Sequence, residues 1–156
     1  MSECACPHCG GLLEAPAPKK PRSLPQHRRY MALCAAAFEH WPSVDTDFRP
    51  RSASHLRYYL EVQAGAFDVT KTARILSADP DKLYALMLAF LQHSDDEKLF
   101  IELDGNLLIE KKARSVAFEE MPHEDFTKLV NAVTEIIENA IGVNAEQLLR
   151  ETSMVA

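Results

Sequence analysis

Three cysteines near the start of the chain are the residues best suited to binding a metal. Cys6 and Cys9 have the C-x-x-C spacing, and Cys4 lies two residues before Cys6. Two thiolates at this spacing fit a tetrahedral zinc ion, but a structural zinc site needs four ligands. The sequence holds no second C-x-x-C. A zinc knuckle completed by His27 or by another chain is one interpretation, and the remnant of a zinc ribbon is the other.

Five basic residues close to the cysteines could bind phosphate groups. They are Lys19, Lys20, Arg22, Arg28 and Arg29. Residues 19–57 hold eight Lys and Arg against three acids, whereas residues 58–156 hold nine against eighteen, in a chain whose net charge is −6. A local cluster of cations in an acidic chain favours nucleic acid as the partner and predicts salt-sensitive binding.

Arg51 and Arg57 could extend the basic cluster at the start of a second helix. One of the two tyrosines that follow Arg57 could then stack on an unpaired base. The alternative is a solvated cationic face that matches the acidic half of the chain within a homodimer. Arg28 and Arg29 lie near a helix N-terminus, where they oppose the helix dipole, and this favours a role other than helix stability.

The remaining polar residues form no recognisable catalytic motif. The sequence has no G-x-S-x-G, no glycine-rich phosphate loop and no H-x-x-x-H pair. Glu124 and Asp125 lie in the first turn of a predicted helix, where the helix dipole alone favours acids. Cys34 lies on the apolar face of another predicted helix, where we expect a buried thiol that serves packing. We therefore expect a protein that is not an enzyme.

Composition and cysteine usage predict a folded, cytoplasmic protein. The hydrophobic fraction of 47% and the charged fraction of 26% are typical of a globular domain. The longest apolar run, residues 83–91, is too short to span a membrane. The first residues lack the basic and apolar regions of a secretory signal. Cysteines this closely spaced suit metal or free thiols better than disulfides, which predicts a reducing compartment.

Proline and charge divide the chain into two parts. Residues 1–22 combine the cysteines with A-P-A-P-K-K-P, which predicts an extended, Pro-rich basic linker. Residues 23–156 are predicted to form a single globular domain. Within it, Ser23 and Gln26 have the spacing of a capping box that opens the first helix. We expect the Ser23 hydroxyl to accept the amide proton of residue 26, and Gln26 to reach back to the Ser23 amide.

Apolar periodicity predicts the elements of this domain. Helices are expected over 23–41, 52–64, 81–93, 123–141 and 145–151, with Ser52 or Ser54 as the cap of the second. The segments 99–103 and 107–110 flank Asp104-Gly105-Asn106, which predicts a β-hairpin with a tight turn. A short strand is expected over 66–70. The fold class is therefore α+β, with four to five helices packed around a small antiparallel sheet.

Three segments resemble a prophage-encoded protein family of unknown function. They are K-P-R-S-L-P-Q-H-R-R-Y-M-A-L-C-A-A-A-F-E-H-W, R-Y-Y-L-E-V-Q-A-G-A-F-D-V and S-V-A-F-E-E-M-P-H-E-D-F-T-K-L-V. The stretch R-S-L-P-Q-H-R-R-Y also resembles the start of lambdoid NinB (Orf) proteins, with His27 where that pattern has asparagine. Those proteins are recombination mediators that bind single-stranded DNA and the host single-strand-binding protein. The resemblance implies a phage origin and single-stranded DNA as a partner.

Two functions from different classes are therefore expected. The leading one is a phage or prophage accessory protein that binds nucleic acid without catalysis, as a mediator of recombination or replication. The alternative is a phage protein that inhibits a host system, including an anti-CRISPR or other anti-defence role. In that case the acidic surface would imitate nucleic acid or bind a basic host protein.

Overall fold

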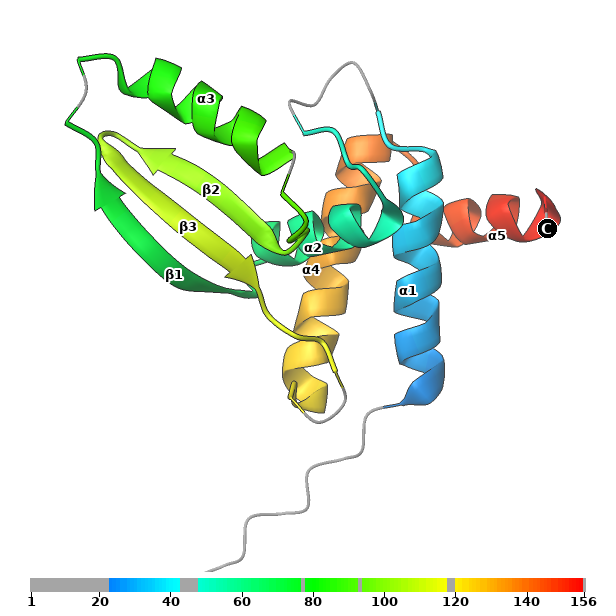
Figure 1. Cartoon of the computed structure of the whole chain (residues 1–156). Coiled ribbons are helices and arrows are strands. Elements are labelled where there is room, and N and C mark those ends of the chain that lie inside the picture. The colour runs from blue at the N-terminus through cyan, green and yellow to red at the C-terminus, as the bar shows by residue number, and fades with distance from the viewer. Residues whose placement is uncertain (1–22, 43–47, 77, 93, 118–119, 156) are drawn as a thin grey trace, which may run out of the picture.

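A computed structural model describes residues 23–42, 48–76, 78–92, 94–117 and 120–155. The predicted N-terminal tail, residues 1–22, lies outside these ranges together with its cysteines and with Lys19, Lys20 and Arg22. The described ranges contain five helices and a three-stranded antiparallel sheet, which confirms the predicted α+β class. Four helices gather on one side of the molecule, and the sheet with the remaining helix lies on the other (Figure 1).

The four gathered helices form what we call the helical core: α1 (Leu24–Glu39), α2 (Ala53–Gln63), α4 (His123–Ile141) and α5 (Ala145–Val155). Apolar side chains at helical spacing on α1 are buried, as predicted, and they include Leu33 and Cys34. Tyr30 packs edge-on against Phe126 of α4, with ring centroids 5.4 Å apart. Each large side chain buried in this way contributes about 1.5–3 kcal/mol, so the helical core carries most of the hydrophobic stabilisation.

The sheet consists of β1 (Phe67–Arg74), β2 (Leu99–Asp104) and β3 (Leu107–Ala113) in the order β1-β3-β2. The predicted hairpin is confirmed: β2 pairs with β3 around Gly105, whose φ is 60°. The first strand is longer than its predicted range of 66–70. It continues to Arg74 because β3 offers backbone partners along its whole length, and the register shifts between Val69 and Lys71.

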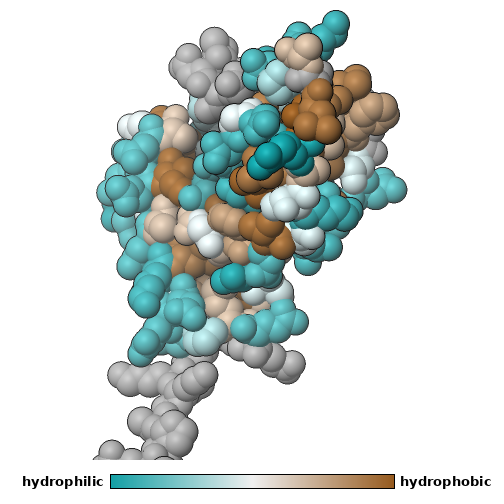
Figure 2. Space-filling view, turned by 90° about the vertical axis from the view of Figure 1, so that its left-hand side faces the viewer, coloured by the Kyte–Doolittle hydropathy of each residue, from teal (hydrophilic) through white to brown (hydrophobic). Residues whose placement is uncertain are grey.

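Helix α3 (Pro80–Gln92) lies along one face of the sheet and makes a second, smaller core with it (Figure 1). We call the sheet and α3 together the sheet module. The buried residues of this second core are Ile75, Ile101 and Leu108, and one side of α3 packs against them. The hydroxyl of Tyr84 donates to the carbonyl of Ile101 at 3.1 Å. Figure 2 views the molecule from the side of this module and shows hydrophobic areas between polar side chains.

Aromatic rings join the sheet module to the helical core. Phe100 of β2 lies 5.6 Å from His55 of α2, with the rings nearly parallel. Phe48 stacks on Tyr59 at 3.7 Å between centroids and also approaches Phe100 at 6.2 Å. The Ser52 hydroxyl donates to Glu97 at 2.8 Å across the same boundary. The two parts are therefore held by both ring contacts and polar contacts near the start of α2.

Helix starts differ in how far the sequence predicts them. The predicted capping box at Ser23 is wrong, because the Ser23 side chain makes no cap and the side-chain amide of Gln26 donates instead to the hydroxyl of Thr127 on α4 at 3.3 Å. The neighbouring helix supplies a partner that local spacing cannot reveal. Ser52 does cap α2, since its hydroxyl accepts from the amide of His55 at 3.0 Å.

In the described ranges, no helix has the length and apolar character that crossing a membrane requires.

Candidate nucleic-acid interface

Arg28 and Arg29 lie on the outside of the first turns of α1, and both side chains are exposed. Successive residues of an α-helix are rotated by about 100° around its axis. Arg28, two residues before the buried Tyr30, is therefore about 200° away from it on the helix surface. Arg28 therefore points away from the side that enters the core. It makes no ion pair with any residue that the structure describes. The guanidinium of Arg28 can therefore bind a phosphate group without breaking an ion pair.

Arg29 forms an ion pair with Glu146 in the first turn of α5. The side chains are 58% and 57% exposed. Pairs as exposed as this contribute about 0–1 kcal/mol and weaken with salt. A nucleic-acid phosphate can compete with Glu146 for the same guanidinium, so Arg29 remains available for binding at a small cost.

The start of α1 also lies beside acidic residues. The contact of Gln26 with Thr127 and the approach of the His27 and Phe126 rings, 5.7 Å apart, place it against the first turns of α4. The exposed acids Glu124 and Asp125 belong to that part of α4. Their charges reduce the positive potential on this side, which limits the affinity that Arg28 and Arg29 can supply alone.

Arg57 faces the interior instead of the predicted surface patch. Its guanidinium pairs with Glu61 at 2.8 Å, and the two side chains are 11% and 0% exposed. The hydroxyl of Tyr30 donates to the same carboxylate oxygen at 3.0 Å. Burial raises the pKa of Glu61 above its ordinary value, although Arg57 and Tyr30 act against this shift. Arg57 therefore neutralises a buried carboxylate, which occupies it structurally.

Arg51 holds two segments of the fold together. Its side chain donates to the carbonyl of Ser94 at 2.6 Å, just after α3, and its backbone amide donates to Nδ1 of His55 at 3.1 Å. Burial, with the nearby charge of Arg51, lowers the pKa of His55. The ring is thus neutral near pH 7, with Nδ1 as an acceptor. Arg51 and Arg57 contact different parts of the fold from Arg28 and Arg29.

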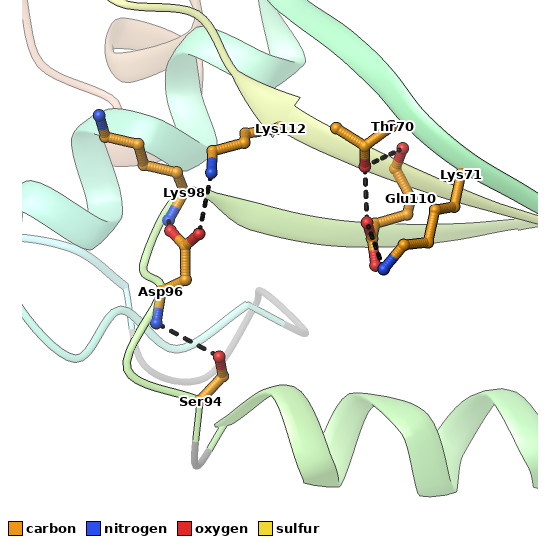
Figure 3. Close-up of polar contacts among 7 residues, drawn as sticks. All are labelled: Thr70, Lys71, Ser94, Asp96, Lys98, Glu110 and Lys112. Atoms are coloured by element: carbon orange, nitrogen blue, oxygen red, sulfur yellow. Dashed lines mark hydrogen bonds and ion pairs between the residues drawn. The ribbon is translucent and has the colours of Figure 1, made fainter.

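Lysines on β1 and β3 are compensated by acids on neighbouring segments. Figure 3 shows Lys71 directed at Glu110, at 3.7 Å, and Lys112 directed at Asp96, at 3.1 Å. Partial burial acts to raise the pKa of Asp96, but the hydrogen bond from the Lys98 amide and the pair with Lys112 outweigh it and lower the pKa. These lysines do not add a second cationic surface.

The cysteines divide between two parts of the chain. Cys4, Cys6 and Cys9 lie outside the described residues, so the zinc knuckle stays a prediction. Among the residues that are described, no group of three or more His, Cys, Asp or Glu could hold a metal ion. Cys34 is buried, as expected, and burial raises its pKa to about 12. Its thiol is therefore protonated at neutral pH and serves packing.

A cleft of about 560 Å³ lies where the turn between α2 and β1 approaches the start of α4. Two ion pairs lie on its wall: Arg114 with Asp68 at 2.8 Å, and Lys128 with Asp125 at 3.9 Å. The sequence does not predict this cleft, because the residues that line it come from segments far apart in the chain. Glu120 lines the cleft as well, so the lining carries three acids against two bases, a balance that does not favour phosphate.

Comparison of the chain with protein-family models, with curated proteins and with solved structures gives no match.

Proposed function

We propose that this protein is a nucleic-acid-binding accessory protein that acts without catalysis, of the type that mediates recombination or replication. The observation that carries the proposal is the exposure of Arg28 and Arg29 near the N-terminus of α1. In the sequence, Lys19, Lys20 and Arg22 come just before this helix. Five cations thus occur within eleven residues of a chain whose net charge is −6. The phage or prophage part of the proposal depends on the resemblance of the three segments alone.

The proposed interface is narrower than the sequence analysis predicts. Arg57 is engaged with the buried Glu61, and Arg51 binds the carbonyl of Ser94. We therefore assign phosphate contacts to the five cations of residues 19–29 and leave Arg51 and Arg57 out. Because Glu124, Asp125 and Glu146 lie near the start of α1, the basic residues before position 23 must supply part of the affinity.

Contacts of this kind bind nucleic acid without sequence preference, and the choice of single-stranded nucleic acid rests on the resemblance to the NinB proteins. Lysines and arginines bind phosphates of any sequence, and base recognition needs further contacts in the grooves or with unpaired bases. For single strands, the logarithm of the binding constant falls by about 0.7 per phosphate contact for each unit in the logarithm of salt concentration. Five contacts therefore predict a slope of about −3.5.

Fluorescence anisotropy with single- and double-stranded oligonucleotides, titrated at several salt concentrations, tests the proposal. Binding at low salt with this slope, weakened by Arg28→Ala/Arg29→Ala, supports it. No binding at low salt contradicts it.

A second candidate is a phage protein that inhibits a host system, including an anti-CRISPR or other anti-defence role. Exposed acids favour it: Asp79 and Asp81 open α3, and Asp104 lies at the turn between β2 and β3. Both segments lie at the same end of the sheet module (Figure 1), together with Arg74 and Lys82, and the excess of one acid there could contribute to binding a basic host surface. A stoichiometric host protein captured after nuclease treatment would favour this candidate over nucleic-acid binding.

A further inference from the structure

The helical core and the sheet module have separate hydrophobic interiors. One cluster of buried residues lies mainly among α1, α2, α4 and α5, and the second lies between α3 and the sheet. Among the described residues, no apolar side chain belongs to both clusters. Burial of apolar surface is the dominant favourable term in folding. The contacts at the boundary between the two clusters therefore decide how firmly the two parts are held together.

The two parts meet at one end of the sheet, in two places (Figure 1). At the first, the chain itself crosses the boundary before β1 and after β3, and the amide of Arg114 donates to the carbonyl of Ala66 at 3.0 Å. Ala66 and Val116 belong to the hydrophobic cluster of the helical core, which fixes these strand ends. We call this place the hinge. At the second place, near the start of β2, the two parts are joined by side chains of residues 48–59 and by residues 94–100.

His55 lies at the centre of this second place and is only 8% exposed. The centroid of its ring is 5.0 Å from that of Phe48 and 5.6 Å from that of Phe100. Nδ1 of the ring accepts a hydrogen bond of 3.1 Å from the backbone amide of Arg51. Only a neutral ring can accept there, because both nitrogens of a protonated imidazole are donors. Protonation of His55 therefore breaks this hydrogen bond and places two donors against each other.

Two further contacts across the boundary depend on the same backbone segment. The side chain of Arg51 donates to the carbonyl of Ser94 at 2.6 Å, and the hydroxyl of Ser52 donates to Glu97 at 2.8 Å. Both contacts join the start of α2 to the segment between α3 and β2. A shift of the Arg51 backbone away from a protonated His55 ring therefore disturbs both of them.

The surroundings of His55 oppose its protonation while the two parts are in contact. The charged groups that act on the ring are Arg51, before α2, and Glu97, before β2. Burial and the charge of Arg51 lower the pKa of His55, and the opposite effect of Glu97 is smaller. The positive end of the α2 dipole also disfavours a cation in the first turn of the helix. Separation of the two parts would return the ring to water, where histidine takes up a proton near pH 6.5.

We propose that His55 is a pH-sensitive latch between the helical core and the sheet module. The neutral ring holds the start of β2 against α2, and the protonated ring releases it. The hinge at Ala66 and Arg114 keeps the two parts connected on the side of β1. The opening is local, because each part retains its own hydrophobic cluster.

Hydrogen exchange of the full chain at pH 7.5 and pH 5.5 tests the latch. The rates are expressed as protection factors, which removes the intrinsic effect of pH on exchange. We expect protection of residues 94–103 to fall severalfold more at pH 5.5 than protection of α1 and α4, since a group with a lowered pKa favours the open state as pH falls.

His55→Asn should remove this difference, because an amide oxygen can accept from the Arg51 amide at both pH values. His40→Asn is the matched control and should behave as the unaltered protein does. His40 is exposed at the end of α1, and its ring contacts the carbonyl of Ala36 in its own helix.

The single tryptophan provides a second readout that needs no variant. Trp41 donates to the carbonyl of Phe48 at 3.3 Å and packs edge-on against Tyr59. Release of the latch should shift its emission to longer wavelength between pH 7.5 and pH 5.5, while the far-UV circular dichroism spectrum keeps its helical signal.

Three outcomes would overturn the proposal. The first is an equal loss of protection in residues 94–103 and in α1 and α4, which would indicate global unfolding. The second is an acid-induced loss that persists in folded His55→Asn and His55→Gln variants. The third is tryptophan emission that stays constant over this pH range.

Discussion

The hydroxyl of Tyr30 donates a hydrogen bond of 3.0 Å to the carboxylate of Glu61, which is completely buried. Arg57, one helical turn before Glu61 on α2, binds the same oxygen. The other oxygen has no hydrogen-bond partner among the described residues. This cluster joins α1 to α2 in the centre of the helical core, and it explains why Arg57 is unsuited to nucleic-acid binding.

Removing Arg57 should destabilise the protein strongly. Arg57→Ala leaves a buried carboxylate without its counter-charge, and changes of this kind cost about 3–5 kcal/mol. The loss in unfolding free energy should be smaller near pH 5, because the pKa of Glu61 is already raised and its carboxylate can take up a proton once Arg57 is removed. Urea unfolding at pH 7.5 and pH 5 measures both values. A loss below about 0.5 kcal/mol, the range of ordinary surface changes, would contradict the role of this pair.

Tyr30→Phe removes one hydrogen bond from the same carboxylate and keeps the aromatic ring. We expect a loss of about 1–3 kcal/mol, the cost of leaving a buried polar group with one partner fewer. Arg28→Ala is the matched control on the same helix, because Arg28 is exposed and its loss should change stability by less than about 0.5 kcal/mol. Equal effects of the two variants would show that the Tyr30 hydrogen bond adds nothing.

Stability should fall on mild acidification because of His55. The pKa of this buried side chain is lowered by burial and by Arg51, against a smaller opposite effect of Glu97. A group with a lowered pKa in the folded state contributes stability that is full above its unfolded pKa, about 6.5 for histidine. That stability is lost as the pH falls through the folded value. His55→Gln should make the unfolding free energy less dependent on pH between 7 and 5, and an unchanged dependence would refute this.

Cys34 should be unreactive until the protein unfolds. Its pKa of about 12 leaves almost no thiolate at neutral pH, and the thiolate is the reactive form. In a variant with Cys4, Cys6 and Cys9 replaced by serine, a thiol reagent should modify the remaining cysteine only in denaturant. Rapid modification of the folded variant would show that α1 opens or that the thiol is accessible.

The sequence predicts those features that depend on neighbouring residues. Helical spacing on α1 identifies Tyr30 as a core residue, and the turn at Gly105 identifies the hairpin. The pair of Arg57 with Glu61 has the i, i+4 spacing that the sequence could have indicated. Its burial could not be predicted, because that requires α1 to bring Tyr30 to Glu61, 31 positions along the chain. The full length of β1 could not be predicted from the sequence for another reason. Its side chains from Asp68 to Arg74 are exposed, so the strand lacks the alternation of apolar residues that marks a half-buried strand.

The zinc prediction needs a test that does not depend on function. Elemental analysis of protein purified without a histidine tag should find zinc if Cys4, Cys6 and Cys9 form a knuckle. The variant Cys6→Ser/Cys9→Ser should then lose the metal, since only one of the three thiolates remains. Protein that holds no zinc after refolding in excess zinc would support the remnant interpretation.

The most direct test of the proposed function compares two double variants that remove the same charge. Arg28→Ala/Arg29→Ala changes the start of α1, whereas Arg74→Ala/Arg150→Ala removes two exposed arginines from β1 and α5. Anisotropy titrations with a labelled single-stranded oligonucleotide give the affinity and its salt slope. We predict that the first variant binds more weakly and that its slope becomes shallower by about 1.4, the value for two lost phosphate contacts, while the second matches the unaltered protein more closely. Equal effects of the two variants, or no binding by the unaltered protein at low salt, would contradict an interface at residues 19–29.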